Sequence, residues 1–312
     1  MSLIYNATFD SQTRILSLLD KAGNTISSCE VPSKSNELTL TATADNSSVK
    51  LTKSGTVDNT YEVNTGSGWT AYEFDTVVPL NTGESCKWRC TNHPTSFMDF
   101  SRYVKFVMTG SIEASGEVYS MLSSNLSDVT TLNGYDYAFV QLFEDCTALI
   151  KAPKLPATTL AGNCYNSMFN GCTGLRQSPA LPATTLATSC YNSMFRDCNS
   201  LTSAPQLPAT TLTPWCYNHM FWGCYELTQA PALPATALAE NCYSQMFVRC
   251  SRIKEVRISA TSTATDALKE WLNGVASTGD FYCDPNATIF PTGASGCPTG
   301  WTRRNIADYP QT

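Results

Sequence analysis

The chain is poor in charge and in histidine. Lys, Arg, Asp and Glu make up 15% of its 312 residues, only two residues are His, and the formal net charge is −6. No run of Lys and Arg is present, so we expect neither a nucleic-acid partner nor binding to an anionic membrane surface. No apolar run approaches the roughly 18 residues that cross a bilayer, so we expect no membrane insertion.

Sequence motifs of catalysis are also lacking. Neither His93 nor His219 has a Ser, Cys or Asp at motif spacing, and no P-loop, GxGxxG, HExxH or GxSxG occurs. We therefore expect a protein that is not an enzyme, with no catalytic residue and no cofactor. The scattered carboxylates leave one alternative open, a glycan-active enzyme with an acidic pair.

One short cluster has metal-ligand residue types. Cys86, Cys90 and His93 form C-x3-C-x2-H, which is half of a zinc site. No fourth ligand lies nearby, and "CKWRC" alternates as a strand with both cysteines on one face. The sequence therefore predicts core packing for the cysteines and no metal.

Cysteine, in contrast, is abundant, and most of it recurs at a fixed spacing of 26 residues. Two series share this step, and Met, Phe, Leu and Pro series follow the same register: Cys146, Cys172, Cys198, Cys224 and Cys250; Cys164, Cys190, Cys216 and Cys242. A fixed period of this length is the signature of a solenoid, in which each unit buries its apolar side against its neighbours. Ala138 stands where the second series would begin, which indicates a small buried position. We therefore expect reduced core thiols, and only Cys283 and Cys297 remain candidates for a bridge.

Within each unit the apolar residues are spaced as on a short helix. In "CYxxMFxxC", Cys190, Met194 and Cys198 follow at i, i+4 and i+8, which predicts one face of about two helical turns. Asn163 and Ser189, like Asn241, are then candidate N-caps. "LTSAPxLP" predicts a short extended segment, and the coils should stack at roughly the 4.7–4.9 Å spacing of strands.

The flanking sequence predicts three further segments. The expected fold class is α+β, mostly β. Its domains are a β-hairpin arm at 1–35, a β-sandwich at 36–120, a leucine-rich-repeat solenoid of 26-residue units at 121–258, and a C-terminal cap at 259–312. In the cap, "DALKEWLNGV" predicts a helix between Asp266 and Gly274. A lone hairpin is marginal in water, so the arm is expected to attach to a partner or a sister subunit.

The repeats resemble those of a known family. Phe169-Asn170-Gly171-Cys172-Thr173-Gly174-Leu175 and its copies are similar to the F-x-x-C-x-x-L core of BspA-like leucine-rich repeats from Bacteroides and other gut bacteria. The segments "NTYEVNTGSGWTAY" and "GASGCPTGWT" resemble flanks found in proteins of gut Bacteroidetes phages, including crAss-like phages. The resemblance implies a solenoid that presents a recognition surface.

One repeat differs from the others at its variable positions. Trp215 stands where the other units have Asn163, Ser189 and Asn241. His219, Trp222 and Tyr225 likewise replace smaller residues in the unit from 207 to 232. Four rings at positions outside the core predict a ligand- or partner-binding patch, because exposed aromatic patches mark binding sites. The alternative is that they pack on the sandwich or on a sister subunit.

Three functions follow as expectations. The preferred one is a non-enzymatic virion or tail-fibre protein of a gut phage, held to other virion proteins or sister subunits by its arm and recognising a host surface glycan or protein. A homo-oligomer is expected, with a trimer as the first guess. The N-terminus shows no signal-peptide pattern, which favours the virion over the first alternative, a bacterial cell-surface adhesin. The second alternative is the glycan-active enzyme.

Overall fold

A computed structural model describes residues 6–10, 15–19, 22–23, 25–30, 36–92, 98–122 and 130–309. The chain forms two compact units, Met1–Asn36 and Glu37–Thr312. The first unit is an antiparallel sheet of three strands in the order β1 (Asn6–Asp10), β2 (Ile15–Leu19) and β3 (Thr25–Glu30). The arm therefore has one strand more than the predicted hairpin, because the residues before Ile15 also pair with β2.

The second unit begins with two sheets of short strands. One sheet has the order β10 (Tyr103–Thr109), β5 (Ser47–Ser54), β8 (Val78–Leu80). The other has the order β12 (Leu149–Lys151), β11 (Ile112–Ser115), β4 (Leu38–Ala42), β9 (Ser85–Cys90), β6 (Tyr61–Asn64), β7 (Trp69–Tyr72). Buried and partly exposed residues alternate along β4 and β9, as a strand with one covered face requires. The Trp88 ring packs edge-on against Phe106 at 5.2 Å, so the two sheets share one core.

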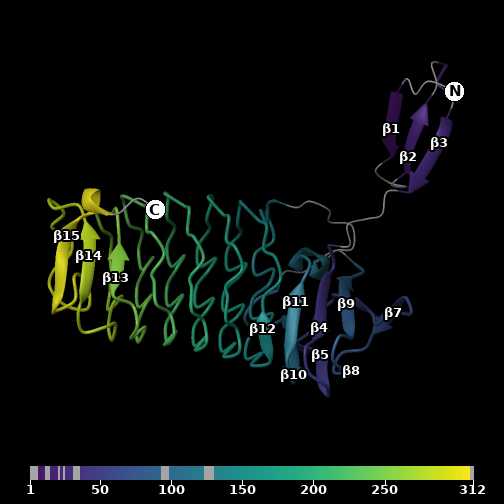
Figure 1. The fold of residues 1–312 in the computed structure, drawn as a ribbon, viewed down its shortest axis with the longest axis horizontal. Coiled ribbons are helices and arrows are strands. Elements are labelled where there is room, and N and C mark those ends of the chain that lie inside the picture. Colours follow the sequence, from purple (N-terminus) through teal and green to yellow (C-terminus); the bar gives the residue numbers. More distant parts are fainter. Residues whose placement is uncertain are drawn as a thin grey trace. The chain divides into compact units, whose positions relative to one another are not determined.

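The repeats continue directly from this core. Strand β12 belongs to the first repeat and pairs in parallel with β11 of the sandwich. Between the two strands the chain forms a short 3₁₀ segment, η1 (Val118–Met121). The Phe106 ring stacks on Phe143 at 5.3 Å. From there a row of buried phenylalanines runs through the coils with centroids 5.5–5.7 Å apart: Phe143, Phe169, Phe195, Phe221 and Phe247. A parallel row of buried tyrosines follows at 5.7–5.8 Å: Tyr165, Tyr191, Tyr217 and Tyr243. Figure 1 shows the coils side by side in chain order.

Each coil is built from turns where the sequence predicted a helix. Every fourth residue has a positive φ, as at Asn163 (54°), Ser167 (55°) and Gly171 (74°). The Asn166 N–H donates to the Asn163 carbonyl (3.1 Å) within the turn, whereas the Ser167 N–H donates to the Asn192 carbonyl (2.8 Å) of the next coil. The backbone is thus satisfied half within a coil and half between coils, and Asn163 lies inside a turn and does not cap a helix.

The spacing of apolar residues explains this error. Cys190, Met194 and Cys198 recur every four residues, and over only eight residues a period of four differs little from the 3.6 of an α-helix. The sequence pattern therefore cannot separate a helix from a chain of four-residue turns. Stacking decides it, because a turn that leaves alternate N–H groups free can bond them to the next coil.

The same reason overturns the helix predicted in the cap. Asp266, Glu270 and Gly274 have φ values of 51°, 49° and 79°, the pattern of the coils before them. The Phe247 N–H donates to the Trp271 carbonyl at 2.9 Å, as one coil does to the next. Residues 264–274 are therefore a sixth copy of the turn run, without cysteine, and the repeat pattern does not stop at Ile258.

The predicted fold class is consequently wrong. The described residues contain strands, turns and two short 3₁₀ segments, η1 and η2 (Ile306–Asp308), but no α-helix. They are almost all β, and their sheets neither close nor form the strand ladder of a leucine-rich-repeat solenoid. The end of the stack carries a parallel sheet in the order β13 (Glu255–Arg257), β14 (Gly279–Cys283), β15 (Trp301–Asn305). Among the residues with assigned structure, none belongs to a helix of the length and apolarity needed to cross a membrane.

The thirteen cysteines from Cys86 to Cys297 are free and buried, including Cys283 and Cys297. The Cys198 Sγ donates to the Phe169 carbonyl at 3.1 Å, and the Cys224 Sγ repeats this contact on Phe195. Removal from water raises the pKa of Cys164 and of Cys242 to about 12. A thiol with so high a pKa is almost entirely protonated at neutral pH and is a poor nucleophile.

We expect a thiol reagent at pH 8 to leave unmodified, in the folded protein, the nine cysteines of the two 26-residue series, here called the cysteine ladders. After denaturation without reductant, at least nine thiols should react, because the ladders hold no disulfide. Counting the reactive thiols before and after adding guanidinium measures the protection in the folded protein and the number of free thiols in the chain. A count near zero in the denatured protein would contradict the reduced ladders.

Candidate functional site

The fourth coil, residues 207–232, has aromatic rings on its core side and four more at positions outside the core. Its inward residues are almost fully buried: Cys216, Tyr217, Met220, Phe221 and Cys224. The four residues that the sequence singled out are exposed or partly exposed, and they are here named the ring face: Trp215, His219, Trp222 and Tyr225. The alternation follows from the four-residue turn, which directs two side chains inward and two outward.

Two members of the ring face are open to solvent. Trp215 is 38% exposed and Tyr225 is 40% exposed, and they are among the few large apolar side chains of the described residues with this exposure. Neither ring stacks on another ring or on a cation within the described part of the chain. Trp215 and Tyr225 are therefore not packed on the sandwich of the same chain. Packing on a sister subunit stays open as an alternative.

Trp222 has a different environment. The Arg196 guanidinium lies over its ring at 4.5 Å from the centroid, and the Arg249 guanidinium lies at 4.9 Å. Arg196 comes from the coil before and Arg249 from the coil after, so Trp222 joins three coils. We call Arg196 and Arg249 the arginine pair. A guanidinium over an indole face is the favourable geometry of a cation–π contact.

The arginine pair is lightly neutralised. The Arg196 Nε lies 3.5 Å from Asp197 Oδ2, a long contact between sequence neighbours that are both partly exposed. Arg249 forms no salt bridge with any carboxylate of the described residues. By comparison, Arg252 in the same coil pairs with Glu226. The ring face thus has positive charge beside it although the whole chain is acidic.

His219 lies at the inner side of this surface. Partial burial is the main cause that lowers the pKa of His219 below the usual 6.5, a bond with Gln245 opposes the shift, and the charge of Arg196 adds to it. Its Nδ1 is bonded to Asn218 Oδ1. The lowered pKa favours the neutral form of the His219 imidazole.

Trp215 is expected to lower the free energy of unfolding because of its backbone conformation. This residue has a φ of 61°, a left-handed conformation that is unfavourable for a bulky side chain and cheap for the asparagine found at positions 163 and 241. In the second coil the Asn166 Nδ2 donates to Asn163 Oδ1 at 3.2 Å. Trp215 offers no such acceptor, and the buried Asn218 Nδ2 has no partner among the described residues.

The structure thus adds three residues that sequence inspection missed. Arg196 and Arg249 are 53 residues apart in sequence, and nothing in either repeat marks it as a neighbour of Trp222. Asn218 looks like its repeat partners Asn166 and Asn192. The 26-residue register contains the only available signal, since it places position 196 one coil before position 222 on the same column.

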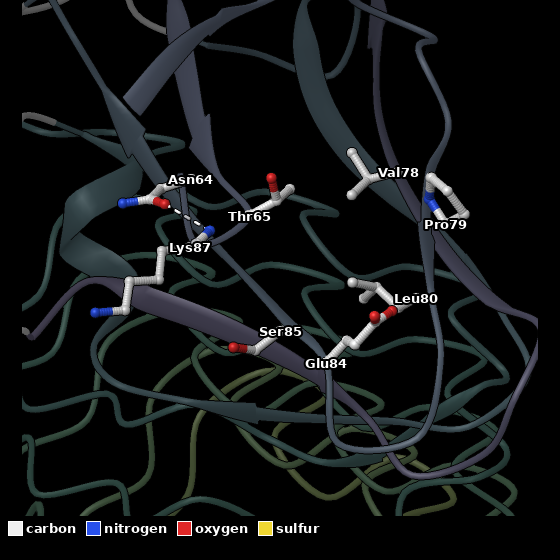
Figure 2. Close-up of a pocket in the computed structure, with 9 residues that line it drawn as sticks. Asn64, Thr65, Val78, Pro79, Leu80, Glu84, Ser85 and Lys87 are labelled. Atoms are coloured by element: carbon white, nitrogen blue, oxygen red, sulfur yellow. Dashed lines mark hydrogen bonds between the residues drawn. The ribbon is translucent and has the colours of Figure 1, made fainter. Parts of the chain in front are cut away.

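A second candidate is an open hollow of about 630 Å³ on the sandwich. Figure 2 shows the residues around it. It is lined by Asn64, Thr65, Gly66, Val78, Pro79, Leu80, Glu84, Ser85 and Lys87. Val78, Pro79 and Leu80 line one side, and Asn64 and Lys87 lie on the other. Asn64 Oδ1 accepts from the Gly66 N–H (2.8 Å) and Glu84 Oε2 from the Asn81 N–H (2.7 Å), so these two groups hold turns.

The two cysteines of the C-x3-C-x2-H cluster pack in the core of the sandwich, as the sequence predicts. Cys86 and Cys90 lie on the buried side of β9, where Cys86 Sγ accepts from Trp88 Nε1 at 3.2 Å and Cys90 Sγ donates to the Asn92 carbonyl at 2.9 Å. His93 lies outside the described residues. Within those residues, no three His, Cys, Asp or Glu side chains gather as a metal site requires.

Comparison with protein families, with curated proteins and with solved structures finds no match to this chain. The geometry of the ring face is therefore the basis for function.

Proposed function

We propose that the protein is a non-enzymatic recognition protein that binds a host-surface glycan or protein through the ring face of its fourth coil. One observation carries the proposal. At Trp215 the chain has a left-handed tryptophan where the coils on either side have Ser189 and Asn241, and it leaves the buried Asn218 Nδ2 without a hydrogen-bond partner among the described residues. Backbone strain and buried polar groups without partners are features that concentrate at functional sites.

The chemistry of the exposed rings supports binding. Trp and Tyr combine a large apolar face with a polar group, and they are the residues most enriched at the centres of binding interfaces. The flat face of an indole or a phenol also suits the apolar face of a sugar ring. Trp215 and Tyr225 expose such faces at the two ends of one turn run, on a core that needs neither of them.

The setting belongs to the same proposal and comes from the resemblance of the repeats and flanks. In it the protein is part of a gut-phage virion, where the arm attaches to other virion proteins or to sister subunits and the coils face the host. Mass spectrometry of purified particles tests this setting. A cell-surface adhesin is the alternative, and it would place the same ring face on a bacterium.

We expect Trp215→Asn to weaken binding and to stabilise the fold. Loss of an anchor ring should lower affinity roughly 10- to 30-fold. The free energy of unfolding should rise by about 1 kcal/mol, because Asn tolerates the left-handed φ and can accept from Asn218 as Asn163 does from Asn166. Binding of labelled protein to intact Bacteroides cells and chemical denaturation measure the two effects.

Phe100→Ser is the matched control, since Phe100 is 54% exposed and lies on the sandwich part of the chain. It removes an exposed ring without touching the fourth coil, so cell binding should stay unchanged. If Trp215→Asn instead lowered stability and left cell binding intact, Trp215 would be a structural residue and the proposal would fail.

A further inference from the structure

We propose that the ligand of the ring face is an acidic saccharide, whose sugar rings stack on Trp215 and Tyr225 and whose carboxylate or sulfate groups bind the arginine pair. This inference rests on the proposed function and narrows its ligand. It starts from the finding that the ring of Trp222 already has cations on it, Arg196 at 4.5 Å and Arg249 at 4.9 Å.

Trp222 acts as a positioning residue in this arrangement. Guanidinium groups stacked on its ring cannot leave that ring open as a platform for a sugar. Contact with the ring instead restricts each guanidinium and removes part of the side-chain freedom that a long arginine loses on binding. A planar fork held in this way is suited to a carboxylate or sulfate, which it can bind through two parallel N–H bonds.

The charge of the surface favours an anion. Arg249 is exposed and has no carboxylate within salt-bridge distance in the described residues, and Arg196 has only the 3.5 Å contact with Asp197. The nearby Arg252, in contrast, is neutralised by Glu226. Arg252 has its counter-charge within the chain, whereas the arginine pair has little. An anionic group of a ligand would supply the missing negative charge.

The backbone of the fourth coil argues for a saccharide over an acidic peptide. One common way in which extended peptides bind is by pairing with free backbone groups at a sheet edge. On this surface the N–H groups are already used, since Trp215 donates to Glu240 (3.0 Å), His219 to Ser244 (3.0 Å) and Gly223 to Val248 (2.8 Å). Recognition is left to side chains, and these are rings and guanidinium groups, which suit sugar faces and acidic substituents.

The test is titration calorimetry of the full chain with four polymers. Polygalacturonate has carboxylates, dextran sulfate has sulfates, neutral dextran has neither, and poly-L-glutamate is an acidic peptide. We expect binding to one or both acidic polysaccharides and weak binding to the other two. The double variant Arg196→Gln/Arg249→Gln should lose roughly 100-fold in affinity, about 10-fold for each charged hydrogen-bonding group.

Two further variants separate this role from general charge and from structure. Lys154→Gln/Arg176→Gln removes the same charge from exposed positions elsewhere on the coils and should change affinity less than about 3-fold. Trp222→Asn, the residue of position 170, should weaken binding of the acidic polymer, and Trp222→Phe should restore most of it because a ring again holds the guanidinium groups.

Several results would overturn the acidic ligand: no binding to either acidic polysaccharide, equal binding of neutral dextran, tighter binding of poly-L-glutamate, or an unchanged double variant. The proposed function is judged separately. If Trp215→Asn still weakens binding to cells while the arginine variants do not, the ring face recognises a neutral ligand, and only the acidic class is rejected.

Discussion

Replacing Phe195 by Ala is expected to lower the free energy of unfolding by about 3–5 kcal/mol. The side chain has no exposed surface, and its ring lies between Phe169 at 5.6 Å and Phe221 at 5.7 Å, within 3° and 8° of parallel. Removing it interrupts the row of rings in its middle and leaves a cavity that the neighbouring coils cannot fill without losing their register.

The loss should be visible in urea denaturation followed by circular dichroism. Phe195→Leu is the matched variant, since it keeps most of the volume and should cost about 1–2 kcal/mol. Because each coil contacts mainly its neighbours, hydrogen exchange should show the largest loss of protection in the coils on both sides of Phe195. A cost below about 1.5 kcal/mol for the alanine variant would contradict the continuous ring row.

The second large effect is expected at the end of the stack, where Gly279→Ala should cost about 2–4 kcal/mol. Gly279 begins β14, and a methyl group there would lie 2.3 Å from the Lys254 carbonyl oxygen and 2.9 Å from the Trp301 ring. The carbonyl oxygen is backbone and cannot rotate away. It also accepts from the Asp280 N–H at 2.9 Å, a bond that the displaced strand would lose.

Gly162→Ala is the control for this change. The nearest atom to its methyl group is a carboxylate oxygen of Asp136 at 3.1 Å, which belongs to a side chain that can move. It should cost less than about 1 kcal/mol. Thermal denaturation compares the two variants, and hydrogen exchange of β14 locates the damage. A Gly279→Ala protein as stable as the parent would show that β14 has room that the structure does not provide.

Part of this protein could be predicted from its sequence because it depends only on periodicity. The 26-residue step determined which residues form the core: Phe169, Phe195 and Phe221 had to fall in one row, and Cys172 and Cys198 in another. The same register exposed the ring face, because Trp215 and Tyr225 stand out only against the residues of the other coils.

The local backbone could not be predicted in this way. Apolar residues four apart are compatible with both a helix and a chain of turns, so Met194 and Cys198 were assigned to a helix that does not form. Asp266 and Gly274 were misread for the same reason. Only the bonds between coils, such as Ser167 to Asn192, distinguish the two backbones, and those bonds form between residues 25 apart.

For the candidate site too, the sequence determines some features and the tertiary structure determines others. The sequence alone determined that the fourth coil has four rings at variable positions where the coils on either side have none. The tertiary structure decided what the rings do: it placed Arg196 and Arg249 on Trp222, left Trp215 and Tyr225 open, and left Asn218 Nδ2 without a partner among the described residues. The reason is physical, since a repeat fixes which residues share a column, whereas contacts between columns depend on how side chains of different length lean across the stacked turns.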